Sequence, residues 1–183
     1  MLNIDLNFEN IYELHVNTTN LKSFSFSSPT INGDNVHIEV WIQDAENLFL
    51  QDFLNLCYGP VADGTMNDFA SVPHLDHSKA LSTVLFCALT YLETQPDKYI
   101  GVDGSDFRRA YLYYRTIQRN YDYLRDYFRL FGVKYYARIL RGSDKNDNMT
   151  VDISELYSVP YKIEQQPLNN HKSLYNYFIM YLA

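Results

Sequence analysis

The chain has 183 residues, a formal net charge of −7 and 46% hydrophobic residues. This length favours one domain, and that apolar content at so small a charge per residue excludes intrinsic disorder. Seven glycines and six prolines exclude collagen-like and low-complexity classes, whereas 17 tyrosines and 11 phenylalanines make aromatic residues prominent. We therefore expect a single domain over residues 1–183 that needs no metal, cofactor or disulfide to fold.

The sequence also favours a cytoplasmic location. Residues 1–10 include Asp5 and Glu9 but no Lys or Arg, which is unlike a secretory signal. The longest apolar stretch, Ala80–Leu92, has the length of a buried helix rather than of a membrane span. Cys57 and Cys87 lie in apolar runs, which favours buried free thiols in a reducing compartment.

Residues 1–72 are expected to form a β-rich, acidic meander. Short strands are expected at 12–16, which is mixed in composition, and at 22–28 and 35–43, where apolar and polar residues alternate. The turn residues at 32–34 predict that the last two form a hairpin. Residues 48–58 fit both a helix and a strand, and the Gly59-Pro60 pair at their end favours strand. A polar loop is expected at 61–72.

Residues 73–141 are expected to form the helical part. Asp76 can cap a helix over 76–94, and a short strand follows at 98–102. Gly104 then turns the chain, and Ser105 can cap a helix through about Asn120. The pattern further predicts a second helix over 121–131 that ends at Gly132, then a strand at 133–140.

The tail, 142–183, is expected to pack on the core. It reads as an exposed loop at 142–148, an extended piece at 156–163 and a short aromatic helix at 174–182. Together these elements predict an α+β domain, in which an antiparallel sheet with an N-terminal meander is covered by three to four helices on one face.

Charge is distributed unevenly along the chain. All eight arginines lie between Arg108 and Arg141, where with Lys134 they give a net charge of +7, while residues 1–70 have a net charge of −9. Helical spacing places Arg108, Arg115 and Arg119 on the face opposite the apolar stripe. The acidic total thus conceals a basic segment, which is compatible with a polyanionic partner.

These patterns give a set of candidate anion-binding residues. A helix that begins after a glycine turn can hold an anion on its free N–H groups, and arginine interleaved with tyrosine suits phosphates and unstacked bases. The alternative is that the arginines are solvated or are neutralised by the acidic half of the same fold. The candidates are Gly104, Ser105, Arg108, Arg109, Arg115, Arg119, Lys134, Tyr136 and Arg138.

Evidence for catalysis is weaker. His74 and His77 could act as metal ligands or as an acid–base pair, but no third ligand is evident, and a polar helix cap explains them as well. Ser105, Asp106, Arg109 and a histidine could serve a small nuclease-like toxin, yet no general base lies near the Gly104 turn in sequence. Whether the protein is an enzyme stays open, and no metal site is predicted.

The middle of the chain resembles an uncharacterised bacterial family of small domains of unknown function. The resemblance covers residues 47–140 and is carried by three stretches: NLCYGPVADG, LSTVLFCALTYL and DGSDFRRAYLYYRTIQRNYDYLRDYFRLFGVKYYARI. In this family an acidic residue usually follows the glycine that corresponds to Gly59, but here that position is Pro60. The resemblance implies a compact cytosolic bacterial protein and transfers no activity.

Three functions are therefore compared. The first is a nucleic-acid- or nucleotide-associated module, with RNA, DNA or a nucleotide as ligand, in a toxin–antitoxin or phage-defence gene pair, a setting common among small families of this kind. The second is an interaction protein without catalysis that binds a cognate protein or forms a homodimer. The third is the nuclease-like toxin.

Overall fold

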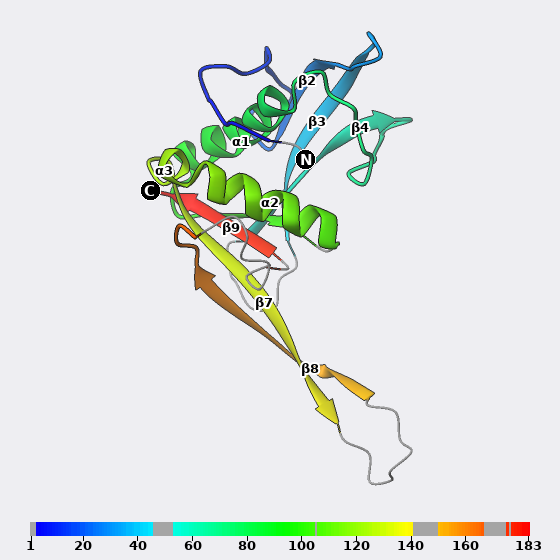
Figure 1. Cartoon of the computed structure of the whole chain (residues 1–183). Coiled ribbons are helices and arrows are strands. Elements are labelled where there is room, and N and C mark those ends of the chain that lie inside the picture. Colours follow the sequence, from blue (N-terminus) through cyan, green and yellow to red (C-terminus); the bar gives the residue numbers. More distant parts are fainter. Residues whose placement is uncertain (1–2, 46–52, 105, 141–149, 167–174, 176) are drawn as a thin grey trace.

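The computed structural model describes residues 3–45, 53–104, 106–140, 150–166, 175 and 177–183 (Figure 1). Within these residues the chain forms nine strands and three helices. The strands are β1 (His15–Val16), β2 (Ser23–Pro29), β3 (Asn35–Asp44), β4 (Phe53–Ala62), β5 (Thr65–Met66), β6 (Tyr99–Asp103), β7 (Phe128–Leu140), β8 (Thr150–Lys162) and β9 (Tyr177–Leu182). The helices are α1 (His77–Thr94), α2 (Phe107–Arg119) and α3 (Tyr121–Leu124).

Eight of these strands form one path of hydrogen-bonded neighbours in the order β1-β2-β3-β4-β6-β9-β7-β8, and β5 pairs with β4. Every neighbouring pair is antiparallel except β4 and β6, which are parallel. The parallel pair arises because α1 carries the chain back across the sheet between β4 and β6, as parallel strands require. The C-terminal strand β9 lies between β6 and β7.

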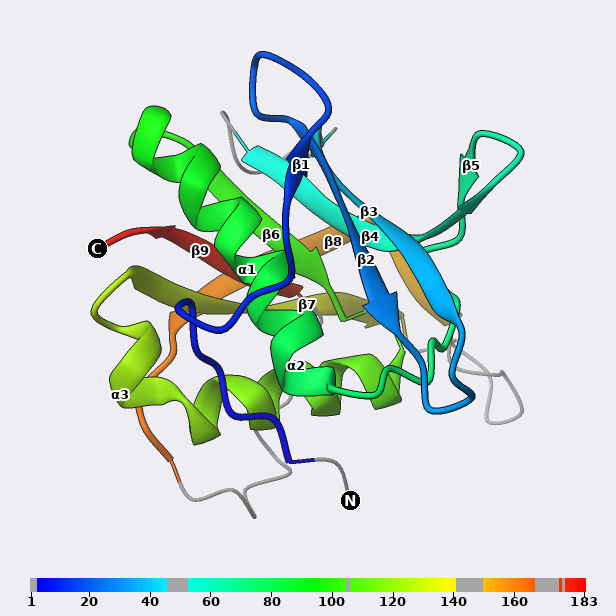
Figure 2. The same cartoon turned by 90° about the horizontal axis from the view of Figure 1, so that it is seen from above.

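The predicted fold class is wrong on two counts. The sheet is mixed rather than antiparallel, and strands predominate over helices within the described residues. The helices do not cover the sheet, because α1 and α2 lie against its central strands (Figure 2) while the ribbon of β7 and β8 projects well beyond them (Figure 1). The physical reason is that two segments expected to be helical contain strands that extend the sheet, one at its end and the other over most of its described length.

The first of these segments is 121–131. Its apolar residues recur at a helical spacing, but only α3 at its start is helical, and Phe128–Leu130 already pair with β9. Gly132 therefore lies inside β7 rather than at a helix end, and the Tyr175 ring occupies the space that a Cβ would need there. The second segment, 174–182, holds β9, so the predicted aromatic helix is also wrong. Aromatic residues suit a half-buried strand at least as well as a helix.

Other predicted elements are confirmed. β2 and β3 form the expected hairpin, and Asp76 caps α1 by accepting a 2.8 Å hydrogen bond from the Lys79 backbone N–H. Strands are present as expected near 98–102, within 133–140 and over most of 156–163. Residues 61–72 are wrong as a pure loop, because β4 continues to Ala62 and pairs with β5. Residues 48–52 and 142–148 lie outside the described part of the chain.

One hydrophobic cluster joins most of these elements. Residues of α1, α2, β2, β3, β4, β6 and β9 share it, and α1 is its most buried helix, with Cys87 and Leu92 fully inaccessible. Leu85 lies at the border of this core and is half-buried. A smaller cluster of Phe53, Val133 and Ile179 sits where β4, β7 and β9 approach one another.

We predict that Gly101→Ala destabilises the protein by about 1–3 kcal/mol, because overpacking of a filled site forces side chains and backbone apart. Gly101 is in the middle of β6, and the rings of Phe53 and Tyr177 fill the space that a Cβ would take. Chemical denaturation measures the change, with Ser27→Ala at an exposed position of β2 as the control. Equal midpoints for Gly101→Ala and the control would show that the two rings move aside freely.

Candidate anion-binding surface

The N-terminus of α2 is closed by a side chain of the protein itself. Asp106 Oδ1 accepts hydrogen bonds from the backbone N–H groups of Arg108 at 2.8 Å and of Arg109 at 2.9 Å. The expectation that Ser105 caps this helix is therefore wrong, and Ser105 itself lies outside the described residues. The carboxylate already occupies the positive end of the helix, where a bound anion was expected. Gly104, which is buried, precedes this turn.

Arg109 points away from the exposed face of α2. Its Nε lies 3.3 Å from Asp106 Oδ2, its Nη2 donates to the backbone oxygen of Asp68, and its guanidinium lies 4.4 Å from the centre of the Phe69 ring. The side chain is 20% exposed. Arg109 therefore fastens the loop before α1 to the start of α2.

Three other candidates do come together. Arg108, Arg115 and Arg119, separated by seven and four residues, line one groove along α2 of about 170 Å³. We call this groove, whose lining is completed by Ile4, Tyr111, Leu112 and Thr116, the α2 groove. The Arg115 guanidinium lies 5.6 Å from the centre of the Tyr111 ring. Among the described residues, no carboxylate lies within ion-pair distance of Arg108 or Arg115.

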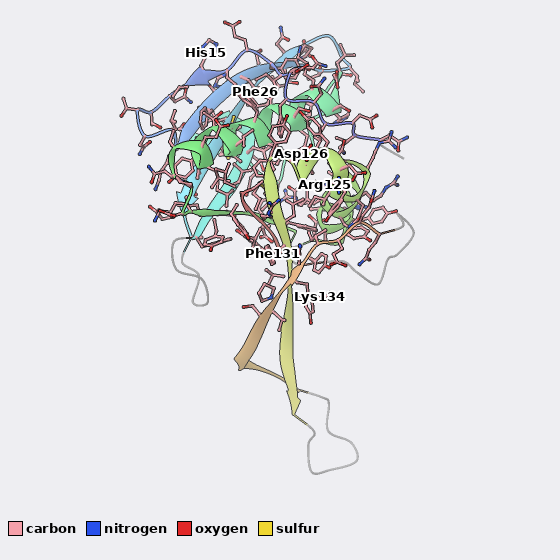
Figure 3. All side chains as sticks on the ribbon, turned by 90° about the vertical axis from the view of Figure 1, so that its left-hand side faces the viewer. His15, Phe26, Arg125, Asp126, Phe131 and Lys134 are labelled. Atoms are coloured by element: carbon pink, nitrogen blue, oxygen red, sulfur yellow. The ribbon has the colours of Figure 1, made fainter. Side chains whose placement is uncertain are left out.

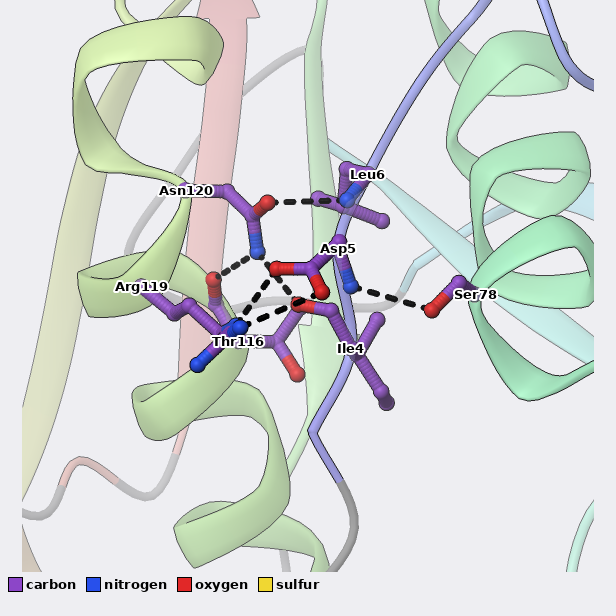
Figure 4. A network of polar contacts seen from close by, with 7 residues as sticks. All are labelled: Ile4, Asp5, Leu6, Ser78, Thr116, Arg119 and Asn120. Atoms are coloured by element: carbon purple, nitrogen blue, oxygen red, sulfur yellow. Dashed lines mark hydrogen bonds and ion pairs between the residues drawn. The ribbon is translucent and has the colours of Figure 1, made fainter.

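Arg119 is different, because it binds an acid of the N-terminal segment (Figure 4). Its Nε lies 2.6 Å from Asp5 Oδ1 and its Nη2 lies 3.1 Å from Asp5 Oδ2. This paired hydrogen bond lowers the pKa of the Asp5 carboxyl and raises the pKa of Arg119. The Asp5 side chain is 70% exposed, so water and salt screen the pair, and its contribution to stability is small.

Asn120 fixes the N-terminal segment beside the α2 groove, and sequence analysis gave it no role. Its amide oxygen accepts from the Leu6 backbone N–H at 2.8 Å, and its amide nitrogen donates to the Ile4 backbone oxygen at 2.9 Å (Figure 4). Ser78 of α1 accepts from the Asp5 N–H at 3.0 Å. An asparagine at the end of a helix carries no sequence signal for such a distant partner.

The remaining candidates lie on β7. Lys134 sits where the ribbon leaves the body, with its ammonium group 5.4 Å from the Tyr175 ring centre and 5.7 Å from that of Tyr161 (Figure 3). It is not among the residues that line the α2 groove. The backbone of Tyr136 pairs opposite Tyr157 and that of Arg138 opposite Asp152. The side chains of Tyr136 and Arg138 lie outside the described part of the structure.

A small polar pocket of about 60 Å³ lies beside Arg109, next to the middle of β4 and the end of β6. In it the Asn55 amide donates to Cys57 Sγ at 3.0 Å and accepts from the Tyr177 hydroxyl. Burial raises the pKa of the Cys57 thiol, and Asp68 and Asp103 add to this effect. The thiol therefore stays protonated, which does not favour it as a nucleophile. No histidine is among the described residues that line this pocket.

The two histidines before α1 form a separate cluster. His74 Nδ1 lies 2.7 Å from the hydroxyl of the buried Ser28, and the His74 and His77 rings meet edge to face with centres 5.4 Å apart. Burial, together with His77, lowers the pKa of His74 to about 4. The hydrogen bond to Ser28 and the lowered pKa favour a neutral His74 ring packed against His77. No group of three or more potential metal ligands occurs among the described residues.

Comparison with known proteins identifies the family. A family of unknown function, DUF6934, matches residues 9–151. The chain belongs to this family. The expected resemblance to a domain of unknown function is thus confirmed, and the DUF6934 match includes α1, α2 and the three arginines of the α2 groove, whereas Asp5 and β9 lie outside it. No curated protein and no solved structure matches the chain. Within the described residues, none of the helices has the length and apolar character that crossing a membrane requires.

We predict that Asn120→Ala destabilises the protein by about 1–3 kcal/mol, because it leaves the Leu6 N–H and the Ile4 carbonyl without their buried partner. Asn120 is 8% exposed. Thermal unfolding measures the effect. Ser78→Ala, which removes only the exposed bond to Asp5, is the control and should cost much less. An Asn120→Ala variant as stable as Ser78→Ala would mean that the N-terminal segment is held by other contacts.

Acid should destabilise the native state through the histidine pair. A His with a native pKa of about 4 binds its proton at higher pH in the unfolded chain, so stability falls as pH drops from about 6.5 to about 4. Because His74 is only half-buried, we expect a loss of about 1–2 kcal/mol. His77, whose pKa burial also lowers, adds to the same trend.

The test is urea denaturation at several pH values. His74→Asn should flatten the stability profile between pH 6.5 and 4, whereas His15→Gln, at an exposed position of β1, should leave it unchanged. If the free energy of unfolding of the wild type and of His74→Asn depended on pH in the same way, His74 would not be the source of the acid destabilisation.

Proposed function

We propose that the protein is a nucleic-acid- or nucleotide-associated module that binds single-stranded RNA or a similar polyanion through the α2 groove. The observation that carries this proposal is the convergence of Arg108, Arg115 and Arg119 on one groove beside Tyr111. Guanidinium groups bind phosphate oxygens in pairs, and an aromatic ring next to them offers a stacking surface for a base.

Because the molecule as a whole is acidic, a polyanion should bind at this groove rather than over the whole surface. The chain is acidic, so a polyanion is repelled from most of its surface and attracted only where positive charge is local. Arg108 is exposed and Arg115 lies at the groove with its guanidinium near an aromatic ring. Single strands are favoured over duplex because unstacked bases can use the Tyr111 face.

The proposal includes a bacterial cytoplasmic setting and a toxin–antitoxin or phage-defence gene pair. Its support is the small size of the chain and its membership of a family of unknown function, a profile common among members of such pairs. This support comes only from what small families of unknown function have in common, whereas the support for the binding groove comes from the positions of its residues.

Replacing Arg108 and Arg115 together by Ala should weaken RNA binding and reduce the slope of log K against log salt by about one to two units, since each phosphate contact in a single strand contributes roughly 0.7. Fluorescence anisotropy with a labelled short single-stranded RNA at several salt concentrations measures both quantities. Lys22→Ala with Lys98→Ala removes the same charge elsewhere and is the control. A wild-type protein that shows no salt-dependent binding at low ionic strength would contradict the proposed function.

Asp5 should compete with the ligand for Arg119. Its carboxylate makes the same paired contact with Arg119 that a phosphate would make. Asp5→Asn should therefore tighten RNA binding several-fold and steepen its salt dependence, because a phosphate can then replace the weaker amide. The same anisotropy titration measures this. In an Arg119→Ala background the substitution should have much less effect, and an equal gain there would mean that Asp5 acts only through net charge.

A further inference from the structure

A second basic hollow lies on the molecule, between the turn after α3, the start of β7 and the end of β8. It measures about 590 Å³, compared with about 170 Å³ for the α2 groove. Pockets that enclose small ligands usually measure about 300–1,000 Å³, so this hollow, unlike the α2 groove, has room for a small organic molecule. We call it the β7–β8 hollow.

Its lining combines cations with one accessible aromatic ring. Arg125, Arg129 and Lys162 contribute the positive charge, and the half-buried Tyr121 contributes aromatic surface. Phe128 lies beneath, 1% exposed and held in the main core, which gives the hollow a rigid base. Apolar walls with a few well-placed polar groups are the usual composition of a small-molecule site.

The cations are positioned by the fold. Arg129 Nη1 donates to the backbone oxygen of Arg125 at 3.2 Å, which fixes one guanidinium nitrogen and orients the others. Lys162 is brought to the same hollow because β8 ends opposite Phe131, and the next residue bonds to the Leu130 carbonyl. Figure 3 shows Arg125 and Asp126 in the body of the protein, above the point where the ribbon begins.

The charged side chains that line the hollow are three cations and one acid. Arg125 lies 3.3 Å from Asp122, and both side chains are more than half exposed. No carboxylate lies within ion-pair distance of Arg129 or Lys162 among the residues that the structure describes. Asp126 is the acidic side chain in the lining, where it would repel a bound phosphate, and Ala183, which carries the terminal carboxylate, lines the hollow as well.

We infer that the β7–β8 hollow is a binding site for a free mononucleotide, in which Arg129 and Lys162 bind the phosphate and the half-buried Tyr121 contacts the base. A single phosphate matches a bidentate guanidinium and a nearby ammonium, and a flat base matches the Tyr121 ring. The site is distinct from the α2 groove and shares no lining residue with it. The inference therefore does not depend on the proposed function.

The experiment is calorimetric titration of the full chain with the 5′-monophosphates of adenosine, guanosine, cytidine and uridine, each separately. At least one should bind, while its nucleoside and inorganic phosphate should bind at least about tenfold more weakly, because each lacks one half of the contacts. Absence of binding by all four nucleotides would overturn the inference. Equal binding of inorganic phosphate would also overturn it, because the hollow would then be only an anion site.

Variants locate the binding. Arg129→Ala and Lys162→Ala should each weaken it about tenfold, the effect of losing a charge-assisted hydrogen bond. Asp126→Asn should strengthen it, a gain that loss of folding cannot imitate. Arg115→Ala, in the α2 groove, is the matched control and should leave it unchanged. If Arg115→Ala weakens nucleotide binding and Arg129→Ala does not, the nucleotide occupies the α2 groove and the inference is wrong.

Discussion

The integrity of the sheet depends on the pairing of β9 with β6 on one side and β7 on the other. Without this six-residue strand, the order of strands would separate into an N-terminal part that ends at β6 and a ribbon of β7 and β8. β9 also contributes Phe178 and Met180 to the main core, where both are almost completely buried. Burial of such side chains contributes roughly 1.5–3 kcal/mol each, so the strand supplies core as well as hydrogen bonds.

The same pairing places the candidate sites. α2 follows β6 directly in the chain, and β7 begins shortly after α3. The helix that carries the arginines is therefore part of the connection between β6 and β7, the two strands that β9 joins. Asn120 and Ser78 then hold the N-terminal segment against α2 and α1, which places Asp5 beside Arg119. The α2 groove is thus formed by an internal helix and by residues at the start of the chain, whereas the β7–β8 hollow depends on where β8 ends.

Local signals were sufficient for part of this fold. The β2–β3 hairpin and the cap of α1 depend on residues close together in the sequence, so alternation and a single Asp76 predicted them. The strand β9 and the start of β7 could not be predicted in the same way. Their aromatic spacing fits a helix and a strand equally, and only pairing between residues about fifty positions apart, such as Phe128 with Leu182, decides between them. The parallel placement of β6 beside β4 is likewise a long-range result.

The candidate site shows the same division. Helical spacing correctly placed Arg108, Arg115 and Arg119 on one face, because that face depends only on the helix. It could not show that Asp106 closes the helix N-terminus, that Arg109 turns toward Asp68, or that Asp5 engages Arg119. These contacts require knowledge of which loops approach α2. Each interpretation of the arginines therefore fits part of the set. Arg119 is paired with an acid of the N-terminal segment, whereas Arg108 and Arg115 line an accessible groove.

Backbone hydrogen exchange of the native full-length chain tests the central role of β9 most directly. If β9 joins the two parts of the sheet, the amides of Ile179 and Met180 should exchange only by global unfolding, as slowly as those of Cys87 and Leu92 in α1. Rapid exchange of the β9 amides, while α1 and the β2–β4 strands remain protected, would show that the sheet is stable without this strand and would contradict the account.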